Sequence, residues 1–258
     1  MRIVVLHKWA PDPQEATVGA DGSVDFSRAK AAVSDYDAVA IQCGRQLADA
    51  AGAALVGVSV GGEAAARPVA TKSALARGLD EVVVVSDPEL EEAGSARTAQ
   101  AIAAAVAALG DVGLVLAGDS SVDVGARMVP AVVAGRLGWP VLADVDSVAL
   151  AGGSVAVERL APEGVQSISA ALPVVIALTS EAVKTKAPGM KDVLGAGKKP
   201  VTVKSLADLG LTALSEGAVT SRAKLGGPAR KGVVIDTSDP AAAAAELVDA
   251  LRAAGALA

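Results

Sequence analysis

The sequence predicts an α/β fold with a doubly wound, mostly parallel sheet, antiparallel additions and a C-terminal arm. Short runs of aliphatic, β-branched residues recur between helical segments and lack polar–apolar alternation, as is typical of strands buried on both faces. Gly52, Gly78 and Gly110 follow the helical segments, where the C-terminus of a helix favours glycine. This alternation of strands and helices indicates a parallel sheet covered by helices on both sides.

The first half of the chain contains four of these strand–helix units. We expect strands at Ile3–Leu6, Ala54–Val60, Glu81–Val85 and Val112–Ala117. We expect helices at Tyr36–Ala51, Glu63–Gly78, Ser95–Leu109 and Gly125–Leu137. Ser95 is suited to the N-cap position of its helix.

The pattern changes after Pro140. AGGS and APEG turns separate short strands, which we expect to be antiparallel hairpins. Another buried strand follows, and then a basic, glycine-containing segment that we expect to be an exposed, flexible loop. In chain order these segments are Val141–Leu150, Ser154–Leu160, Val165–Ser169, Val174–Thr179 and the loop Ser180–Pro200. A short helical turn is expected at Ser205–Leu211.

The tail has a different composition. Ser215–Lys231 reads as a polar linker, Gly232–Pro240 as a short strand leading to a helix start, and Ala241–Ala254 as an amphipathic helix. A lone helix of that length is marginal in water, so it must pack on its own domain or on a partner. We therefore expect an α/β domain of the nucleotide-binding type at 1–211 and a linker with a C-terminal arm at 212–258.

Composition excludes several classes of protein. The formal net charge of −6 argues against a nucleic-acid surface. The single cysteine, Cys43, leaves no intramolecular disulfide and no cysteine-rich metal site, and we expect it to be packed in its helix. The first apolar run is too short for a signal peptide, and no segment has the character of a membrane span. We expect a cytoplasmic protein with no direct membrane insertion.

The most informative segment is Leu114–Pro140, where a buried strand turns through small and polar residues into an apolar helix. The unpaired N–H groups and the dipole of a helix N-terminus attract an anion. Ligands of open α/β sheets bind beyond the carboxyl ends of the strands. We therefore expect this turn to meet Leu6–Asp12, Ser34–Asp37 and Ser59–Gly62, although an ordinary surface turn is the alternative for the loop taken alone.

Within this turn, Ser120, Ser121 and the amides of Val124–Val129 are suited to hold a phosphate. Asp119 and Asp123 would repel a phosphate, so we expect them to be helix caps or partners of a ribose hydroxyl.

Catalytic motifs are missing from the sequence. No GxxxxGK[ST] motif is present, and no GxGxxG follows a strand. His7 is the only histidine and lies in the first strand, where a packed structural role is favoured. One histidine and one cysteine in such positions leave no credible nucleophile–base pair. We expect a carrier that uses the chemistry of a cofactor and is not itself an enzyme.

Several segments occur in an order and at spacings typical of one family. They are the turn His7–Pro13, the segment Ala74–Val85, the loop Gly118–Asp123 with Leu137–Pro140, the strand Leu172–Val175 and the turn Ser205–Gly210. In these segments the chain resembles the beta (small) subunit of electron-transfer flavoprotein, as a divergent paralogue. The resemblance runs from residue 1 to about residue 211 and is looser in the tail.

The resemblance implies an adenine-nucleotide alpha-hydrolase-like fold and a heterodimer with an alpha subunit that holds or shares FAD. It implies AMP in this subunit, or a second FAD as in some family members. The residues that it assigns to the nucleotide are Leu6, Ser34, Asp35, Tyr36, Asp37, Val60, Gly118, Asp119, Ser120, Ser121, Val122, Asp123, Val124, Gly125, Ala126, Arg127, Met128 and Val129.

The resemblance also implies redox partners. Electrons would arrive from dehydrogenases, such as the acyl-CoA dehydrogenases of fatty acid beta-oxidation, and would leave to a quinone oxidoreductase. Met190, followed by Lys191, takes the place of the apolar anchor in the partner-recognition loop at 180–200. Gly125 and Met128 depart from the family's acidic residue and glutamine in the phosphate loop, and Val183–Ala187 replaces a family motif.

Two other functions are compatible with the sequence. One is a free-standing adenine-nucleotide-binding module of universal-stress type, which would have no use for Ser180–Ala258. The other is an enzyme of small-molecule metabolism on the same fold, which the missing pair of base and nucleophile disfavours.

Overall fold

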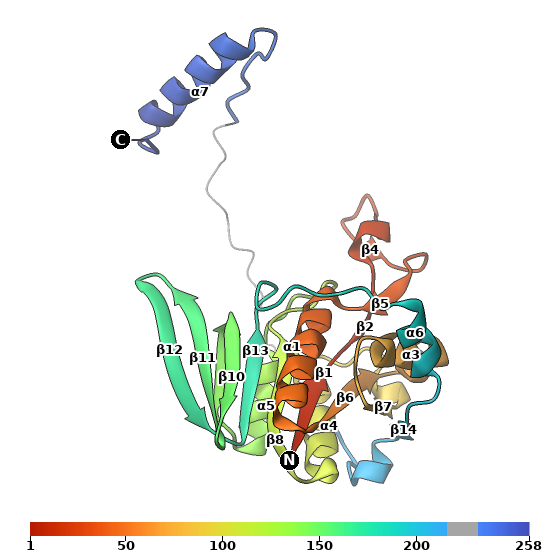
Figure 1. Ribbon diagram of the computed structural model, residues 1–258. Coiled ribbons are helices and arrows are strands. Elements are labelled where there is room, and N and C mark those ends of the chain that lie inside the picture. Colours follow the sequence, from red (N-terminus) through yellow and green to blue (C-terminus); the bar gives the residue numbers. More distant parts are fainter. Residues whose placement is uncertain (216–231, 258) are drawn as a thin grey trace. The chain divides into compact units, whose positions relative to one another are not determined.

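The first structural unit of the chain is built on a seven-stranded parallel sheet (Figure 1). The computed structural model describes residues 1–215 and 232–257 and divides into two units, Met1–Gly217 and Ala218–Ala258. The strand order is β14-β7-β6-β1-β8-β13-β9, which confirms the predicted doubly wound α/β fold. The strands are β1 (Arg2–Leu6), β6 (Ala54–Gly61), β7 (Glu81–Ser86), β8 (Val112–Gly118), β9 (Val141–Val145), β13 (Val174–Leu178) and β14 (Val201–Lys204).

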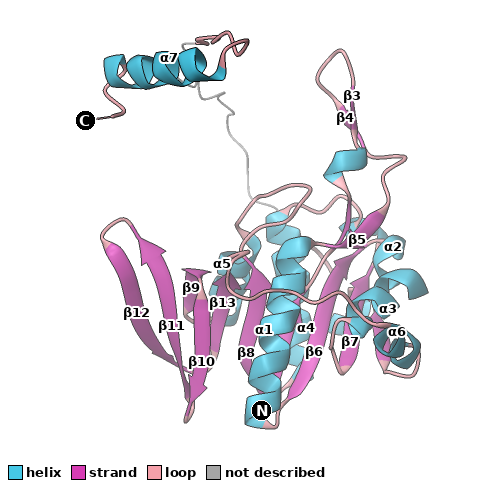
Figure 2. Ribbon diagram, turned by 45° about the horizontal axis from the view of Figure 1, so that its top comes forward, coloured by secondary structure: helices cyan, strands magenta, loops and turns pink. Residues whose placement is uncertain are grey.

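Helices cover both faces of this sheet (Figure 2). Ile3 and Val5 of β1 pack in one hydrophobic cluster with α1, α3 and α6, whereas Val4 and Leu6 pack in a second cluster with α4 and α5. Cys43 is buried in α1, as predicted. The helices are α1 (Asp35–Ala51), α2 (Glu63–Ala66), α3 (Pro68–Ala76), α4 (Ser95–Leu109), α5 (Val129–Leu137) and α6 (Met190–Ala196), with 3₁₀ turns η1 (Pro13–Glu15), η2 (Pro88–Leu90) and η3 (Ala207–Leu209).

Smaller antiparallel sheets are added to this core, and the sequence predicts those that follow Pro140. A three-stranded sheet buries Val155 and Val157 in the cluster that includes α1. Two short ladders, β2 with β5 and β3 with β4, form between β1 and α1. The strands of these sheets are β2 (Trp9–Pro11), β3 (Thr17–Val18), β4 (Val24–Asp25), β5 (Ala31–Val33), β10 (Ser147–Ala151), β11 (Ser154–Ala161) and β12 (Gly164–Ala171).

The prediction of one antiparallel strand at Val141–Leu150 was wrong, because the chain leaves the main sheet at Asp146. β9 pairs with β13 in parallel, and only β10 joins the antiparallel sheet. The Asp146 carboxylate accepts hydrogen bonds from the Thr179 hydroxyl at 2.7 Å and from the Leu160 N–H at 2.9 Å. These contacts with distant residues fix the break between the two strands.

Two predicted helices have different bounds. The helix expected at Glu63–Gly78 is divided, because Pro68 holds Arg67 in an extended conformation with ψ 145°. The helix expected from Gly125 begins at Val129, because Gly125 and Arg127 have φ angles of 63° and 53°. These left-handed residues keep the loop between β8 and α5 out of the helix.

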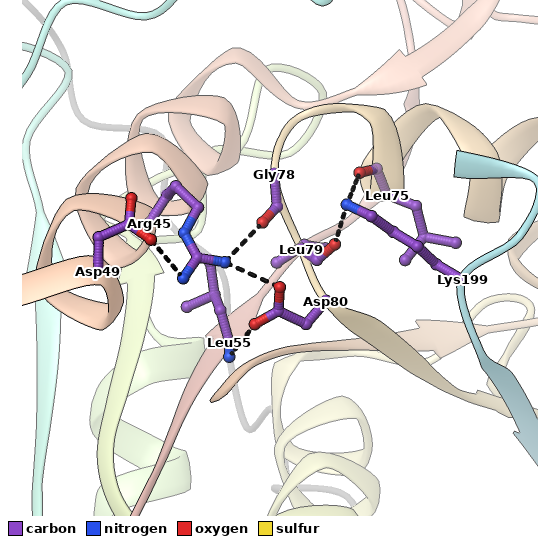
Figure 3. A network of polar contacts seen from close by, with 8 residues as sticks. All are labelled: Arg45, Asp49, Leu55, Leu75, Gly78, Leu79, Asp80 and Lys199. Atoms are coloured by element: carbon purple, nitrogen blue, oxygen red, sulfur yellow. Dashed lines mark hydrogen bonds and ion pairs between the residues drawn. The ribbon is translucent and has the colours of Figure 1, made fainter. Parts of the chain in front are cut away.

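The segment 180–200, predicted to be a flexible loop, ends in helix α6 and leads into an unpredicted edge strand, β14. The Asp192 carboxylate accepts the Gly189 N–H at 3.0 Å and caps α6. Lys199 then donates from Nζ to the carbonyls of Leu75, at 3.1 Å, and Leu79, at 2.6 Å (Figure 3). Lys199 therefore ties β14 to the C-terminal end of α3, which is a structural role.

A second group of polar contacts lies beside Lys199 (Figure 3). Arg45 of α1 pairs with Asp80 at 2.9 Å and donates to the Gly78 carbonyl at 3.2 Å. Asp80 in turn accepts the Leu55 N–H at 2.8 Å. Because β6 and β7 begin here, these contacts align the amino ends of the strands.

The second unit contains α7 (Pro240–Ala253), which the sequence predicts. Residues 232–239, expected to include a short strand, have no regular structure; Val233 and Val234 are exposed. The predicted linker Ser215–Lys231 lies outside the described residues, apart from Ser215. None of the helices in the described part of the chain is long and apolar enough to span a membrane.

We predict that Lys199→Met lowers the free energy of unfolding by about 1–3 kcal/mol, because it leaves the carbonyls of Leu75 and Leu79 without their charged donor. Lys198→Met is the matched control, since Lys198 is exposed and adjacent in sequence. Urea unfolding of both variants measures the difference. Equal stability of the two variants would show that the contacts of Lys199 do not support the fold.

Candidate nucleotide-binding site

A cleft of about 360 Å³ lies at the carboxyl edge of the parallel sheet. The loops after β1, β6, β7 and β8 line it. The strand order reverses between β1 and β8: β6, β7 and β14 follow on one side of β1, and β13 and β9 follow on the other side of β8. Such a switch point is the usual ligand-binding position of a doubly wound sheet.

Most of the residues predicted to bind a nucleotide line this cleft. They are Leu6, Asp37, Val60, Gly118, Asp119, Ser120, Ser121, Val124, Ala126, Arg127, Met128 and Val129. Three of the four segments predicted to converge, Leu6–Asp12, Ser59–Gly62 and Gly118–Val129, therefore meet at this cleft, and Asp37 alone represents the fourth.

The other predicted residues lie outside the cleft lining. Asp35, Tyr36 and Val122 line a second hollow of about 470 Å³, together with residues of α1 and of the segment after β13. Ser34 is buried at the start of α1, and its carbonyl accepts the Asp37 N–H at 2.9 Å. Asp123 and Gly125 belong to the loop but do not line either hollow.

The sequence did not reveal the part of the cleft that follows β7. Glu91, Gly94, Ser95 and Thr98 line it, as do Trp9 and His7 on other loops. A Gly-Ser pair at the start of a predicted helix was visible in the sequence. Its place in the site depends on β7 lying next to β6, which the sequence alone does not give.

Two helices start at the cleft without a carboxylate in their first turns. α4 begins at Ser95 and α5 at Val129, and neither has a side-chain hydrogen bond at its N-cap. Their first N–H groups and dipoles favour an anionic ligand. Gly118, which precedes the phosphate loop, allows close packing here, since a Cβ atom would lie 2.8 Å from the backbone carbon of Tyr36.

An ion pair joins the two central loops. Lys8 Nζ lies 2.6 Å from Asp123 Oδ2, and only 9% of the Asp123 side chain is exposed. Burial acts to raise the pKa of Asp123, but the hydrogen bonds from Lys8 and Ser121 and the charge of Lys8 outweigh it and lower that pKa. Asp123 also accepts the Val124 N–H at 2.8 Å within the loop. The expected role as a helix cap was wrong, because the N-cap of α5 is Met128, five residues further on.

Asp37 is a buried carboxyl group on the floor of the cleft. Its Oδ2 accepts the Lys8 N–H at 2.8 Å. Burial raises the pKa of Asp37 to about 7, and the N–H groups of Lys8 and Gly118 limit that rise. Asp37 is therefore partly protonated at neutral pH.

His7 is buried beside Asp37, directly after β1. Burial lowers the pKa of His7 to about 4, against a smaller opposing effect of the Val5 carbonyl. Its Nδ1 has no hydrogen-bond partner. The ring fills space left by Gly57, where a Cβ atom would lie 2.9 Å from His7 Cε1. His7 is thus a neutral, packed residue, as predicted, and it also lines the cleft.

Asp119 and Arg127, near the two ends of the loop between β8 and α5, form an ion pair. Arg127 Nη2 lies 2.7 Å from Asp119 Oδ2, and it also contacts Asp144. Burial raises the pKa of Asp119, and the charge of Arg127 opposes that rise.

A profile of the electron transfer flavoprotein domain matches residues 21–209. The chain belongs to this family. The residues that match the electron transfer flavoprotein domain include the cleft loops after β6, β7 and β8. They also include Met190 and Lys191, which lie at the exposed start of α6, with 78% of Met190 accessible.

The shifted pKa values of Asp37 and His7 predict opposite effects of pH on the stability of the folded state. The folded state holds a proton on Asp37 that the unfolded state releases between pH 3.8 and about 7, so stability falls as pH rises through this window. The unfolded state holds a proton on His7 that the folded state lacks between about pH 4 and 6.5, so stability rises with pH there.

We therefore predict that, as pH rises from 4 to 7, the difference in the free energy of unfolding between Asp37→Asn and the wild type shifts by about 4 kcal/mol in favour of the variant. His7→Gln should lose about 3 kcal/mol relative to the wild type between pH 4 and 6.5. Urea unfolding at each pH measures both differences. Curves parallel to the wild type would show that these groups titrate normally in the folded state.

Proposed function

We propose that this chain is the beta (small) subunit of a heterodimeric electron-transfer flavoprotein, with AMP as a structural nucleotide in its cleft. The observation that carries the proposal is a nucleotide-sized cleft at the switch point of the sheet, most of whose lining lies within the residues that match the family. In this proposal the chain is an electron-carrier subunit without catalytic residues of its own.

The residues of the cleft fit AMP. The starts of α4 and α5 favour the phosphate dianion, and Arg127 lines the same end of the cleft. The aliphatic side chains of Leu6, Val60 and Ile102 provide apolar walls for an adenine ring.

FAD would supply the electron-transfer chemistry and would be held by, or shared with, the alpha subunit. The second hollow supports this arrangement, because Tyr36 offers an aromatic side chain beside Arg77 and Val122. This chain would contribute to the position of the flavin and to the exclusion of water from it.

Two exposed apolar surfaces support the proposed partners. Met190, Val193 and Leu194 of α6 are 78%, 53% and 70% exposed, and this surface would dock dehydrogenases, such as acyl-CoA dehydrogenases, and the accepting quinone oxidoreductase. α7 buries none of its residues and exposes Leu247. An amphipathic helix of this kind needs a partner surface, which we assign to the alpha subunit.

Co-expression with an alpha subunit, followed by denaturation of the purified complex and chromatography of the released nucleotides, tests the proposal. We predict equimolar FAD and AMP per heterodimer. Twice as much FAD and no AMP would place a second flavin in the cleft. A nucleotide-binding monomer that does not bind the alpha subunit would indicate the free-standing module. A monomer without nucleotide would contradict the proposal altogether.

We predict that Met190→Asp slows electron transfer from a partner dehydrogenase by about tenfold or more, because a charge would replace an exposed apolar anchor. Val165→Asp is the matched control, since Val165 is 67% exposed on β12, remote in sequence from α6. Flavin reduction by the dehydrogenase, followed by absorbance, measures the rate. An unchanged rate in Met190→Asp would show that α6 is not part of the docking surface.

A further inference from the structure

Arg127 occupies an unusual position in the phosphate loop. It lies in the left-handed region with φ 53°, two residues before α5 begins. Its guanidinium contacts Asp119 of the same loop and Asp144, which follows in β9 and is also left-handed with φ 55°. The side chain is 55% exposed and lines the cleft.

Among the described residues, those that line the cleft include two basic side chains of the lysine and arginine type, Lys8 and Arg127. Lys8 pairs with Asp123, whose side chain is only 9% exposed. If Lys8 turned towards a ligand, it would leave a buried carboxylate unpaired, which is strongly unfavourable. Lys8 is therefore held in its ion pair.

Arg127 can release one of its partners at low cost. The Asp144 side chain is 56% exposed, whereas that of Asp119 is 12% exposed. Water can solvate the Asp144 carboxylate once the guanidinium leaves, and exposed ion pairs of this kind contribute little. A guanidinium carries five N–H donors in a planar fork, so it can keep Asp119 and bind a second anion at the same time.

We propose that Arg127 is the phosphate-binding side chain of the cleft, that Asp119 positions it, and that Asp144 competes with the phosphate for it. This inference rests on the proposed nucleotide site. The bound phosphate would take the place of Asp144 on the guanidinium and would accept N–H groups from the start of α5. Asp144 thereby weakens the binding of a phosphorylated ligand and has no effect on an unphosphorylated one.

Calorimetric titration of the nucleotide-stripped protein, in its complex with the alpha subunit if one forms, tests this with AMP and adenosine as probes. Arg127→Gln should weaken AMP binding by about tenfold or more, since a charged hydrogen bond is lost, with adenosine binding unchanged. Arg127→Lys should lie between Arg127→Gln and the wild type. Asp144→Asn should tighten AMP binding by up to about fivefold, more at low ionic strength. Arg127→Gln/Asp144→Asn should bind AMP as weakly as Arg127→Gln alone.

The matched control is Arg136→Gln, because Arg136 lies in the last turn of α5 and donates to Ser215. It should leave both affinities unchanged. Unchanged AMP binding in Arg127→Gln, or equal weakening of AMP and adenosine, would overturn the role of Arg127. Unchanged or weaker AMP binding in Asp144→Asn would overturn the competition. A wild-type protein that binds neither probe would overturn the nucleotide site itself, and with it this inference.

Discussion

The pairing of β1 with β8 is the contact on which the cleft depends. These strands lie side by side with Ile3 opposite Leu114 and Val5 opposite Leu116, and the chain runs outward from them in both directions. The loops that leave their carboxyl ends turn to opposite faces of the sheet, one towards α1 and the other towards α5. The space between them is the cleft, and the Lys8–Asp123 ion pair joins the two loops. A different order of strands would leave the same loops without a common site.

The two edges of the sheet have different chemistry. At the amino edge, Arg45 pairs with Asp80, and Lys199 donates to the carbonyls of Leu75 and Leu79 (Figure 3). At the carboxyl edge, polar atoms of Asp119, His7 and Ser34 are buried without a partner. Buried polar groups are normally hydrogen-bonded. His7 and Asp119 line the cleft, whereas the Nε atom of Arg45, which is also buried without a partner, lies at the amino edge.

The strands and the main loop of the site could be predicted because burial on both faces produces continuous aliphatic runs, such as Val112–Ala117. The direction of β9 could not, because it is fixed by Asp146 through contacts with Leu160 and Thr179, which are distant in the chain. The late start of α5 depends on the left-handed conformation of Arg127, a residue type that gives no such signal. To predict that α4 contributes to the cleft, one would need to know that β7 lies next to β6, and only the order of strands in the sheet gives this.

The contact between His7 and Gly57 has a consequence for how this sequence can change over time. His7, Gly57 and Leu79 share one volume, since a Cβ atom on residue 57 would lie 2.9 Å from the imidazole and 2.5 Å from Leu79 Cδ1. A larger residue at position 57 becomes acceptable only when the side chains at positions 7 and 79 both give way. These three positions therefore constrain one another, and a small aliphatic side chain at position 7 would not by itself permit the loss of the glycine, because Leu79 would still occupy the same space.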